Sequence, residues 1–302
     1  LTADVSNPGQ IVDTSKTGEH TITYEATDSS GNVGQAVRIV TVSHALVLGG
    51  KAIDGYLVGA TVIFDADGDG VHDLADTNET DSSGEFALAF TASELAEYDK
   101  DDNGQIEAGE GIFILSGGVD SSTGTAFDGS LTALPDSTVV TPLTTLIASL
   151  VQQGKDADDA ASLVSQAFGI DASVDLSSYD PLEMATEADS QAAAVLAAGA
   201  QVMNVMLQTA ATVDYASNKN LSSAAVSLAV ADQLATVVSA ATTPIDLAAD
   251  LDLLSTITSA SLAASDPKAT LNSSDLAAAV QLTASINDMV ADSLAVNAND
   301  PE

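Results

Sequence analysis

Residues 56–76 read Tyr56-Leu-Val-Gly-Ala-Thr-Val-Ile-Phe64 followed by Asp65-Ala-Asp-Gly-Asp-Gly-Val-His-Asp-Leu-Ala-Asp76. The first nine residues are mostly apolar or β-branched, which favours a strand. The remaining residues combine acidic side chains at alternate positions with glycines, which favours a tight loop. A second acidic stretch, Asp99 to Glu110, follows a helix-like segment at 92–98. We therefore expect a β unit in which a strand and a short helix each lead into an acidic loop.

The stretch Asp99-Lys-Asp-Asp-Asn-Gly-Gln-Ile-Glu-Ala-Gly-Glu110 resembles the twelve-residue calcium loop of EF-hand proteins at every diagnostic position. Ca²⁺ takes roughly six to eight oxygen ligands, which a loop that curls once around the ion supplies, and the glycine at position 6 permits the sharp turn. The predicted ligands are Asp99, Asp101, Asn103, the backbone carbonyl of Gln105, Glu107 directly or through water, and Glu110. A strand-like run, Ile112–Leu115, follows where a full EF-hand has a second helix, so we expect metal binding without a sensor's opening motion.

The stretch 65–76 matches the same loop at positions 1, 3, 5, 6, 9 and 12. The predicted ligands are Asp65, Asp67, Asp69, the backbone carbonyl of Val71, Asp73 and Asp76. The last of these is shorter than the usual Glu, which favours monodentate binding. His72 replaces the usual apolar residue at position 8, so we expect that this loop does not pair with the other as in a sensor. The alternative for both stretches is a solvated acidic turn.

The composition limits the functional classes. The 302 residues include 7 Lys+Arg, 44 Asp+Glu, of which 33 are Asp, and no Cys or Trp, giving a net charge of −37. This charge excludes a protein that tracks nucleic-acid phosphates and argues against docking on anionic lipid. The lack of Cys excludes disulfides, thiolate zinc sites and Cys nucleophiles. The Asp bias favours calcium loops, with a solvated acidic surface as the alternative.

Signatures of catalysis are missing from the sequence. The three histidines, His20, His44 and His72, stand in no zinc or triad spacing. There is no Gly-x-Ser-x-Gly elbow and no phosphate-binding Gly-rich Lys motif. The lack of Trp and an aromatic content of 4% disfavour a glycosidase cleft, although a pair of catalytic carboxylates stays open. We expect no enzymatic activity.

Residues 1–44 are predicted to form a partial β domain. His20–Ala26 alternates with period two, and a turn cluster separates it from a second strand at Ala36–Val42, which predicts a hairpin. The pattern Tyr24-x-Ala-x-Asp-x-x-Gly-Asn32, followed by Arg38-Ile-Val-Thr-Val42, resembles the C-terminal half of the bacterial Ig-like domains repeated in surface proteins. The resemblance implies an incomplete Ig-like fold, whose other strands come from further chain or another molecule, and an extracellular location on the bacterial cell surface.

Residues 45–138 are predicted to form a second, calcium-binding β-sandwich. The run from Asp54 to Asp65 and the segment Thr80-Asp-Ser-Ser-Gly-Glu-Phe86 resemble the transthyretin-like sandwiches of cell-surface proteins and the calcium-binding B repeats of Gram-positive adhesins. Three further segments resemble one that recurs in very large secreted proteins of Gram-negative bacteria, with no implied catalytic activity: 117–124, 137–146 and 175–182.

Residues 139–298 are predicted to form an α-helical bundle. Thr141-Pro142, Asp180-Pro181 and Thr243-Pro244 each combine a capping residue with a proline at the first helical position. The expected helices are 142–153, 156–168, 181–217, 222–241, 244–263 and 273–296. The uncharged run 190–213 has the length of a membrane span, but its Gln and Asn residues favour a buried bundle helix.

Together these patterns predict a multidomain α+β chain: an incomplete Ig-like β-sandwich, a second Ca²⁺-binding β-sandwich, and then an all-α helical bundle. The leading hypothesis is a non-catalytic, calcium-stabilised structural segment of an extracellular bacterial adhesin or matrix protein. Two alternatives are a self-assembling filament subunit that uses strand complementation, and an accessory glycan- or peptide-binding module of a secreted enzyme. Because the chain begins at Leu1 without Met, we expect a piece of a longer protein. The expected partners are neighbouring domains of that chain and other copies, with no nucleic acid and no membrane insertion.

Overall fold

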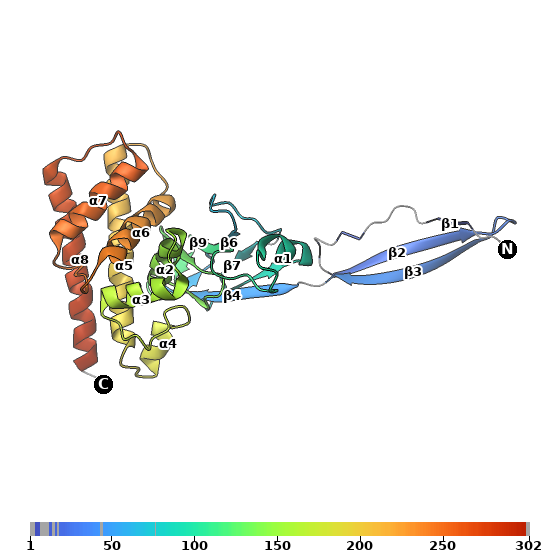
Figure 1. The fold of residues 1–302 in the computed structure, drawn as a ribbon, viewed down its shortest axis with the longest axis horizontal. Coiled ribbons are helices and arrows are strands. Elements are labelled where there is room, and N and C mark those ends of the chain that lie inside the picture. The colour runs from blue at the N-terminus through green and yellow to red at the C-terminus, as the bar shows by residue number, and fades with distance from the viewer. Residues whose placement is uncertain are drawn as a thin grey trace.

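The computed structural model describes residues 4–6, 12, 13, 16, 18–42, 45–75 and 77–299, with side chains described only outside 4–6 and 294–299. Figure 1 shows three parts in chain order along the longest axis: an extended hairpin, a β unit and a bundle of helices. The predicted class, β-rich sheets followed by a helical bundle in an α+β chain, is confirmed. The predicted domain boundaries at 44/45 and 138/139 stay predictions.

The hairpin consists of β2 (Gly18–Thr27) and β3 (Val33–Val42), which pair antiparallel over their full length. Its turn is held by Asp28, whose carboxylate accepts hydrogen bonds from the backbone N–H groups of Ser30 at 2.8 Å and Asn32 at 2.9 Å. A short strand, β1 (Asp4–Ser6), pairs with the other side of β2. The sheet order β1-β2-β3 leaves β3 at the edge. The predicted hairpin is therefore confirmed.

The β unit contains a four-stranded sheet of order β11-β9-β6-β7 and a three-stranded sheet of order β12-β4-β8. Phenylalanine side chains fill the space between them: the ring centroids of Phe64 and Phe90 lie 5.1 Å apart, and those of Phe86 and Phe113 lie 5.4 Å apart. Such edge-to-face contacts are favoured between aromatic rings. The strands are β4 (Leu46–Ala52), β5 (Leu57–Val58), β6 (Thr61–Asp65), β7 (Asn78–Glu79), β8 (Glu85–Phe90), β9 (Ile112–Ser116), β10 (Val119–Asp120), β11 (Ser130–Ala133) and β12 (Val139–Val140).

In the β unit, the structure divides one predicted strand and confirms one predicted helix. The run 56–64 is not a single strand, because Gly59, with φ of 68°, breaks it into β5 and β6. The helix α1 (Ala92–Tyr98) forms where expected. It begins with a capping box in which Thr91 and Glu94 each bind the other's backbone N–H group.

The helical region begins at α2 and differs from the prediction at two places. The helices are α2 (Pro142–Gln152), α3 (Ala157–Phe168), α4 (Pro181–Thr186), α5 (Ala192–Ser217), α6 (Ser223–Ala240), α7 (Leu251–Ser265) and α8 (Ser273–Asn299). The expected helix 181–217 is two helices, since Ala188 has the left-handed φ of 57°. The expected start at 244 was wrong, because the N–H of Ile245 binds the carbonyl of Ala167 at 2.8 Å and the first helical turn forms only after Asp250.

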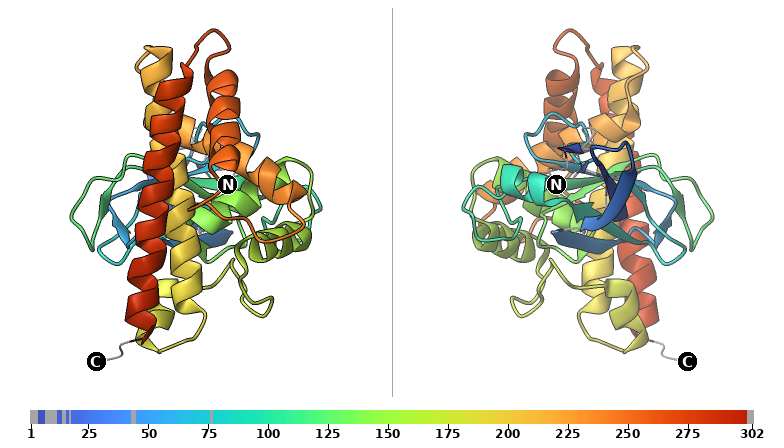
Figure 2. Two further views of the ribbon diagram at one scale, coloured as in Figure 1. Left: turned by 90° about the vertical axis from the view of Figure 1, so that its left-hand side faces the viewer. Right: turned by 90° about the vertical axis from the view of Figure 1, so that its right-hand side faces the viewer.

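The long helices α5 and α8 run side by side (Figure 2). Between them, Nδ2 of Asn204 donates to Oδ1 of the fully buried Asn287 at 2.7 Å. Buried polar pairs of this kind need complete satisfaction, and they favour one register of the two helices. By length and composition alone, α5 and α6 are apolar enough to cross a membrane, and both contribute residues to the buried apolar cluster of the bundle.

Candidate metal centre

The two acidic loops lie at the same end of one sheet. Loop 1 (residues 65–76) begins at the last residue of β6, and loop 2 (residues 99–110) ends just before β9. Because β6 and β9 pair antiparallel, Asp65 lies opposite Ile112. A cavity of about 310 Å³ lies between residues 65–68, Gly109, Gly111 and the C-terminal end of α2. The loops therefore share their support in the β unit and approach the first helix of the bundle.

The two loops have the same internal hydrogen bonds. In each, the N–H of the glycine at position 6 donates to the carboxylate at position 1, at 2.9 Å for Gly70 to Asp65 and 2.7 Å for Gly104 to Asp99. These glycines have φ of 78° and 85°, which other residues adopt at a cost. The N–H groups at positions 5 and 7 donate to the side chains at positions 3 and 5, at distances of 3.1 and 2.8 Å in loop 1 and 3.2 and 2.8 Å in loop 2.

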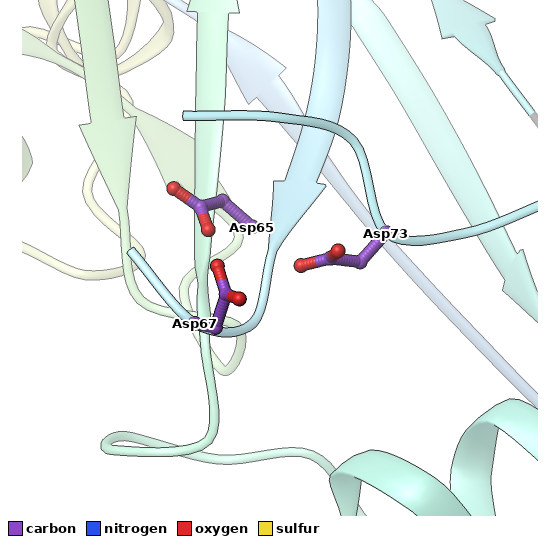
Figure 3. Close-up of side chains that lie close together, drawn as sticks. All are labelled: Asp65, Asp67 and Asp73. Carbon is purple, nitrogen blue, oxygen red and sulfur yellow. The ribbon is translucent and has the colours of Figure 1, made fainter. Parts of the chain in front are cut away.

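Three carboxylates meet in loop 1. Figure 3 shows that the side chains of Asp65, Asp67 and Asp73 point toward one another, and one oxygen from each lies within 4.8 Å of the others. Asp65 is 2% exposed, so its charge is largely removed from water. Asp76, the predicted ligand at position 12, lies outside the residues that the structure describes.

Loop 2 has a corresponding cluster of Asp99, Asp101 and Glu110. Asp99 and Glu110 are buried, whereas Asp101 is exposed. Burial raises the pKa of Asp99, but hydrogen bonds from the backbone N–H groups of Gly104 and Asn103 outweigh it and hold that pKa below its usual value. The carboxylate is thus ready to act as a ligand without losing a proton near neutral pH.

The two loops close through different positions. In loop 2, Glu110 at position 12 accepts the N–H of Lys100, the residue at position 2, at 2.6 Å. In loop 1, Asp73 at position 9 accepts the corresponding N–H of Ala66 at 2.7 Å. Asp73 therefore occupies the place in loop 1 that Glu110 occupies in loop 2.

The other predicted ligands are less completely placed. Asp69 and Glu107 lie outside both carboxylate clusters, which contain only described residues. The side-chain oxygen of Asn103 and the carbonyls of Val71 and Gln105 stay predicted ligands. Every predicted ligand atom in the two loops is a hard oxygen, which fits Ca²⁺ better than a soft metal. The ammonium of Lys100 donates to the carbonyl of Gly109 at 2.9 Å and is not paired with a cluster carboxylate.

Two side chains that the sequence analysis did not assign to the site connect the loops. The hydroxyl of Tyr98 donates to the carbonyl of Asp73 at 3.0 Å. Glu94 accepts the N–H of Ala75 with one oxygen and that of Thr91 with the other, both at 2.7 Å. The signal for Glu94 was the capping-box spacing from Thr91, whereas no local pattern pointed from Tyr98 to a residue 25 positions earlier.

Comparison with known proteins identifies one segment. Residues 1–42 match the family described as bacterial surface protein, Ig-like domain. This finding agrees with the resemblance of the hairpin, and a domain of this kind implies a surface or secreted protein. No curated protein and no solved structure matches the chain.

Proposed function

We propose that this chain is a non-catalytic, calcium-stabilised structural segment of an extracellular bacterial adhesin or matrix protein. The observation that carries the proposal is the pair of acidic loops with equivalent hydrogen bonds, each bringing three carboxylates within 4.8 Å of one another. The Ig-like segment at residues 1–42 supports a surface location. Mg²⁺ fits less well, because it demands a smaller octahedral site and retains several waters.

The physical role of the ion is to remove repulsion. Three carboxylates in a cluster repel one another, more strongly where burial lowers the dielectric constant. A bound Ca²⁺ reverses the sign of that interaction and binds only the closed loop. At an ion concentration about tenfold above Kd, such linkage stabilises the folded state by about 1.4 kcal/mol per site. Extracellular modules bind calcium at roughly 10⁻⁴–10⁻³ M, which suits permanent loading outside a cell.

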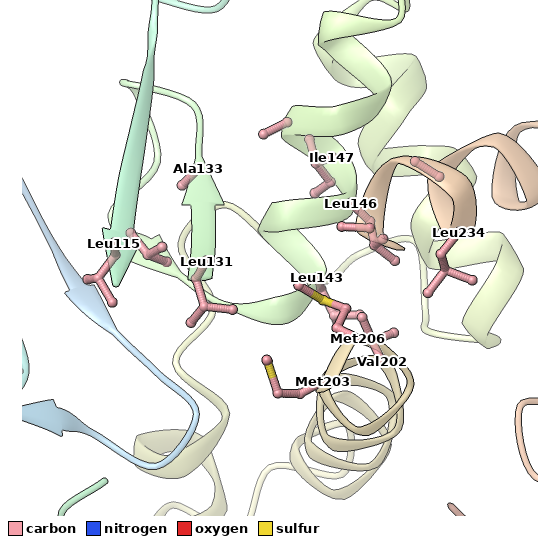
Figure 4. Packing of buried hydrophobic residues seen from close by; sticks show 14 of the residues in the cluster. Leu115, Leu131, Ala133, Leu143, Leu146, Ile147, Val202, Met203, Met206 and Leu234 are labelled. Carbon is pink, nitrogen blue, oxygen red and sulfur yellow. The ribbon is translucent and has the colours of Figure 1, made fainter. Parts of the chain in front are cut away.

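Ordering of the β unit extends to the helices through a shared core. Figure 4 shows Leu115 of β9 and Leu131 of β11 on one side of Leu143 in α2, with Met206 of α5 on the other side. All four belong to one cluster of buried apolar residues that extends from Ala52 to Ala284. Closely packed interiors resist small displacements. Calcium in the loops therefore fixes the position of the β unit on the bundle.

Calorimetric titration with Ca²⁺, combined with sedimentation velocity and small-angle scattering, tests this role. We expect about two ions per chain, a monomer that becomes more compact with Ca²⁺, and one ion after Asp99→Asn. Asp159→Asn, which removes an exposed charge on α3, is the matched control and should retain both ions. Absence of binding at millimolar Ca²⁺ would contradict the proposal, as would binding without any change in shape or stability.

A second candidate is a filament subunit that assembles by strand complementation. The supporting observation is the sheet edge at β3, where Val33, Val37 and Ile39 are 60%, 62% and 59% exposed. Among the described residues no further strand pairs with this edge, and such an edge with exposed apolar side chains favours addition of another strand. Sedimentation at increasing concentration tests this candidate: Val37→Asp should abolish assembly, whereas Leu282→Asp, at an exposed apolar position on α8, should not. A strictly monomeric wild type with Ca²⁺ would contradict it.

A further inference from the structure

A cavity of about 100 Å³ lies where the β unit meets the helices. Its walls come from the turn at 53–55, the start of α2, the segment 176–181 and the first turns of α5. The apolar lining includes Ile53, Leu143, Leu176, Pro181, Val195 and Leu196. Drug-sized ligands need pockets of roughly 300–1,000 Å³, so this cavity suits only a short chain of atoms.

Asp54 is the one acidic residue in the lining of this cavity. It occupies the two-residue turn Asp54-Gly55 between Ile53 and Tyr56, and Gly55 has φ of 67°. The carboxylate of Asp120 lies directly against Gly55, so that a side chain there would collide with it. Loss of water around Asp54, together with the negative charge of Asp120, raises the pKa of Asp54 to about 6.

The described part of the chain supplies no cation to this carboxylate. The nearby ammonium of Lys51 is bound to Asp180 at 3.2 Å, and the other ion pairs of the described residues are Lys16–Asp13 and Lys219–Asp266. By contrast, Asp120 is satisfied by the hydroxyls of Ser122 and Thr123, each at 2.7 Å. A partly desolvated carboxylate next to a second negative charge lacks the opposite charge that ordinarily accompanies burial.

We propose that this joint cavity binds a primary alkylammonium group, with its aliphatic chain against the apolar lining and its ammonium on Asp54. The cation would offset the repulsion between Asp54 and Asp120, while the methylene groups leave water. A lysine side chain and a free alkylamine share this chemistry. An anion would be repelled by both carboxylates, and a neutral alcohol would gain only the apolar contact.

Titration with n-butylammonium at pH 7.5 and 2 mM Ca²⁺, followed by NMR of backbone amides, tests the inference. We expect saturable shifts at residues 53–55 and 195–200, with n-butanol binding at least tenfold more weakly and ammonium chloride giving no saturation. Asp54→Asn should weaken n-butylammonium at least tenfold and leave n-butanol unchanged. Nα-acetyl-lysine methylamide distinguishes the two sources of the ammonium group. If it binds, the natural ligand is a lysine side chain. If it does not bind while n-butylammonium does, the natural ligand is a free alkylamine.

A second pair of variants tests the cavity independently of charge. Gly199 lines the cavity, and a side chain added there meets open space. Gly199→Leu should therefore fill the cavity and abolish binding of both probes, whereas Ala194→Leu, exposed on the same helix, should not. Thermal unfolding verifies that both variants are folded. No saturable shift in the wild type, or equal n-butylammonium binding by Asp54→Asn, would overturn the inference.

Discussion

The hydroxyl of Tyr98 donates a hydrogen bond of 3.0 Å to the backbone carbonyl of Asp73. Tyr98 is the last residue of α1 and directly precedes Asp99, the first predicted ligand of loop 2, whereas Asp73 closes loop 1. Glu94, in the first turn of the same helix, accepts the N–H of Ala75 in loop 1. The helix α1 thus leads into loop 2 and contacts loop 1 at both ends, and under the proposed function we expect Ca²⁺ binding in one loop to favour binding in the other.

Tyr98→Phe should reduce this coupling while both sites remain. The substitution removes one hydrogen bond, worth about 1 kcal/mol, and keeps the ring against Phe64. Calorimetry on the wild type and on the single-loop variants Asp67→Asn and Asp101→Asn gives the coupling free energy, which we expect to fall by about 1 kcal/mol when Tyr98→Phe is added to each protein. Tyr215→Phe, at a residue that is 72% exposed, is the control. An unchanged coupling free energy would mean that the hydrogen bond from Tyr98 to Asp73 contributes to folding stability and not to communication between the two sites.

Asp73→Asn should remove the ion from loop 1. Its carboxylate is in the cluster with Asp65 and Asp67 and also accepts the N–H of Ala66. We expect at least a tenfold weaker affinity at that loop, with loop 2 still binding. Calorimetry detects the loss of one binding event. If Asp76→Asn removed the ion and Asp73→Asn did not, the ligand that closes loop 1 would be Asp76 at position 12 and not Asp73 at position 9.

Gly111→Ala should disturb both loops. A side chain at Gly111 would collide with the ring of Phe64 and approach the carbonyl of Asp65 to 3.0 Å, at a residue with φ of 151°. Overpacking of this kind costs about 1–3 kcal/mol. Gly109→Ala is the control, because its φ of 92° is also unfavourable for Ala but nothing lies within 4 Å of the added carbon. Calcium titration should show weakening at both sites in the first variant and at loop 2 alone in the second.

The local chemistry of the loops could be predicted from the sequence because each depends on neighbouring residues. Asp65 and Gly70, or Asp99 and Gly104, are five positions apart, and the turn that joins them is formed within the loop. The same holds for the hairpin, whose turn residue Asp28 binds the N–H of Asn32 four positions later. Short-range hydrogen bonds and caps carry their own sequence signals.

The features that escaped prediction depend on distant partners. The helix expected from residue 244 begins at Leu251 because Ile245 binds Ala167. The contact between Tyr98 and Asp73 and the joint cavity at Asp54 arise only when separate segments pack together. Tertiary contacts override local propensity at such places, and no pattern along the chain records them.

The pKa of Asp54, raised to about 6, predicts a pH dependence of stability. Since the ordinary value is 3.8, the folded state binds more protons than the unfolded state between these values. Stability contributed by the neutral carboxyl is therefore present below about pH 4 and is lost as pH rises through 6. Asp54→Asn should match the wild type at pH 4 and exceed its free energy of unfolding by about 2 kcal/mol at pH 7. Denaturant titrations measure this, with Asp159→Asn as the control; an equal gain at both pH values would contradict it.

Asp180 joins the β unit to the helices through four hydrogen bonds. Its carboxylate accepts the N–H groups of Leu182 and Glu183 at the start of α4, at 3.0 and 3.1 Å. It also accepts the ammonium of Lys51 at 3.2 Å and the hydroxyl of Tyr56 at 3.0 Å, both from the β unit. Asp180 is only 7% exposed, so water could not readily replace its carboxylate as the acceptor for these donors.

Asp180→Ala should cost about 3–5 kcal/mol, because it removes a helix cap and leaves the ammonium of Lys51 without a partner in a partly buried position. Asp250→Ala is the matched control: Asp250 caps α7 through the N–H of Leu253 at 2.9 Å and has no ion pair among the described residues, so only about 1 kcal/mol should be lost. In denaturant titrations, the difference in unfolding free energy between the two variants measures the contribution of the Asp180 contacts with Lys51 and Tyr56. Small-angle scattering should show a more variable orientation of the β unit on the helices in Asp180→Ala alone. Equal losses of unfolding free energy in the two variants would mean that Asp180 acts only as a helix cap.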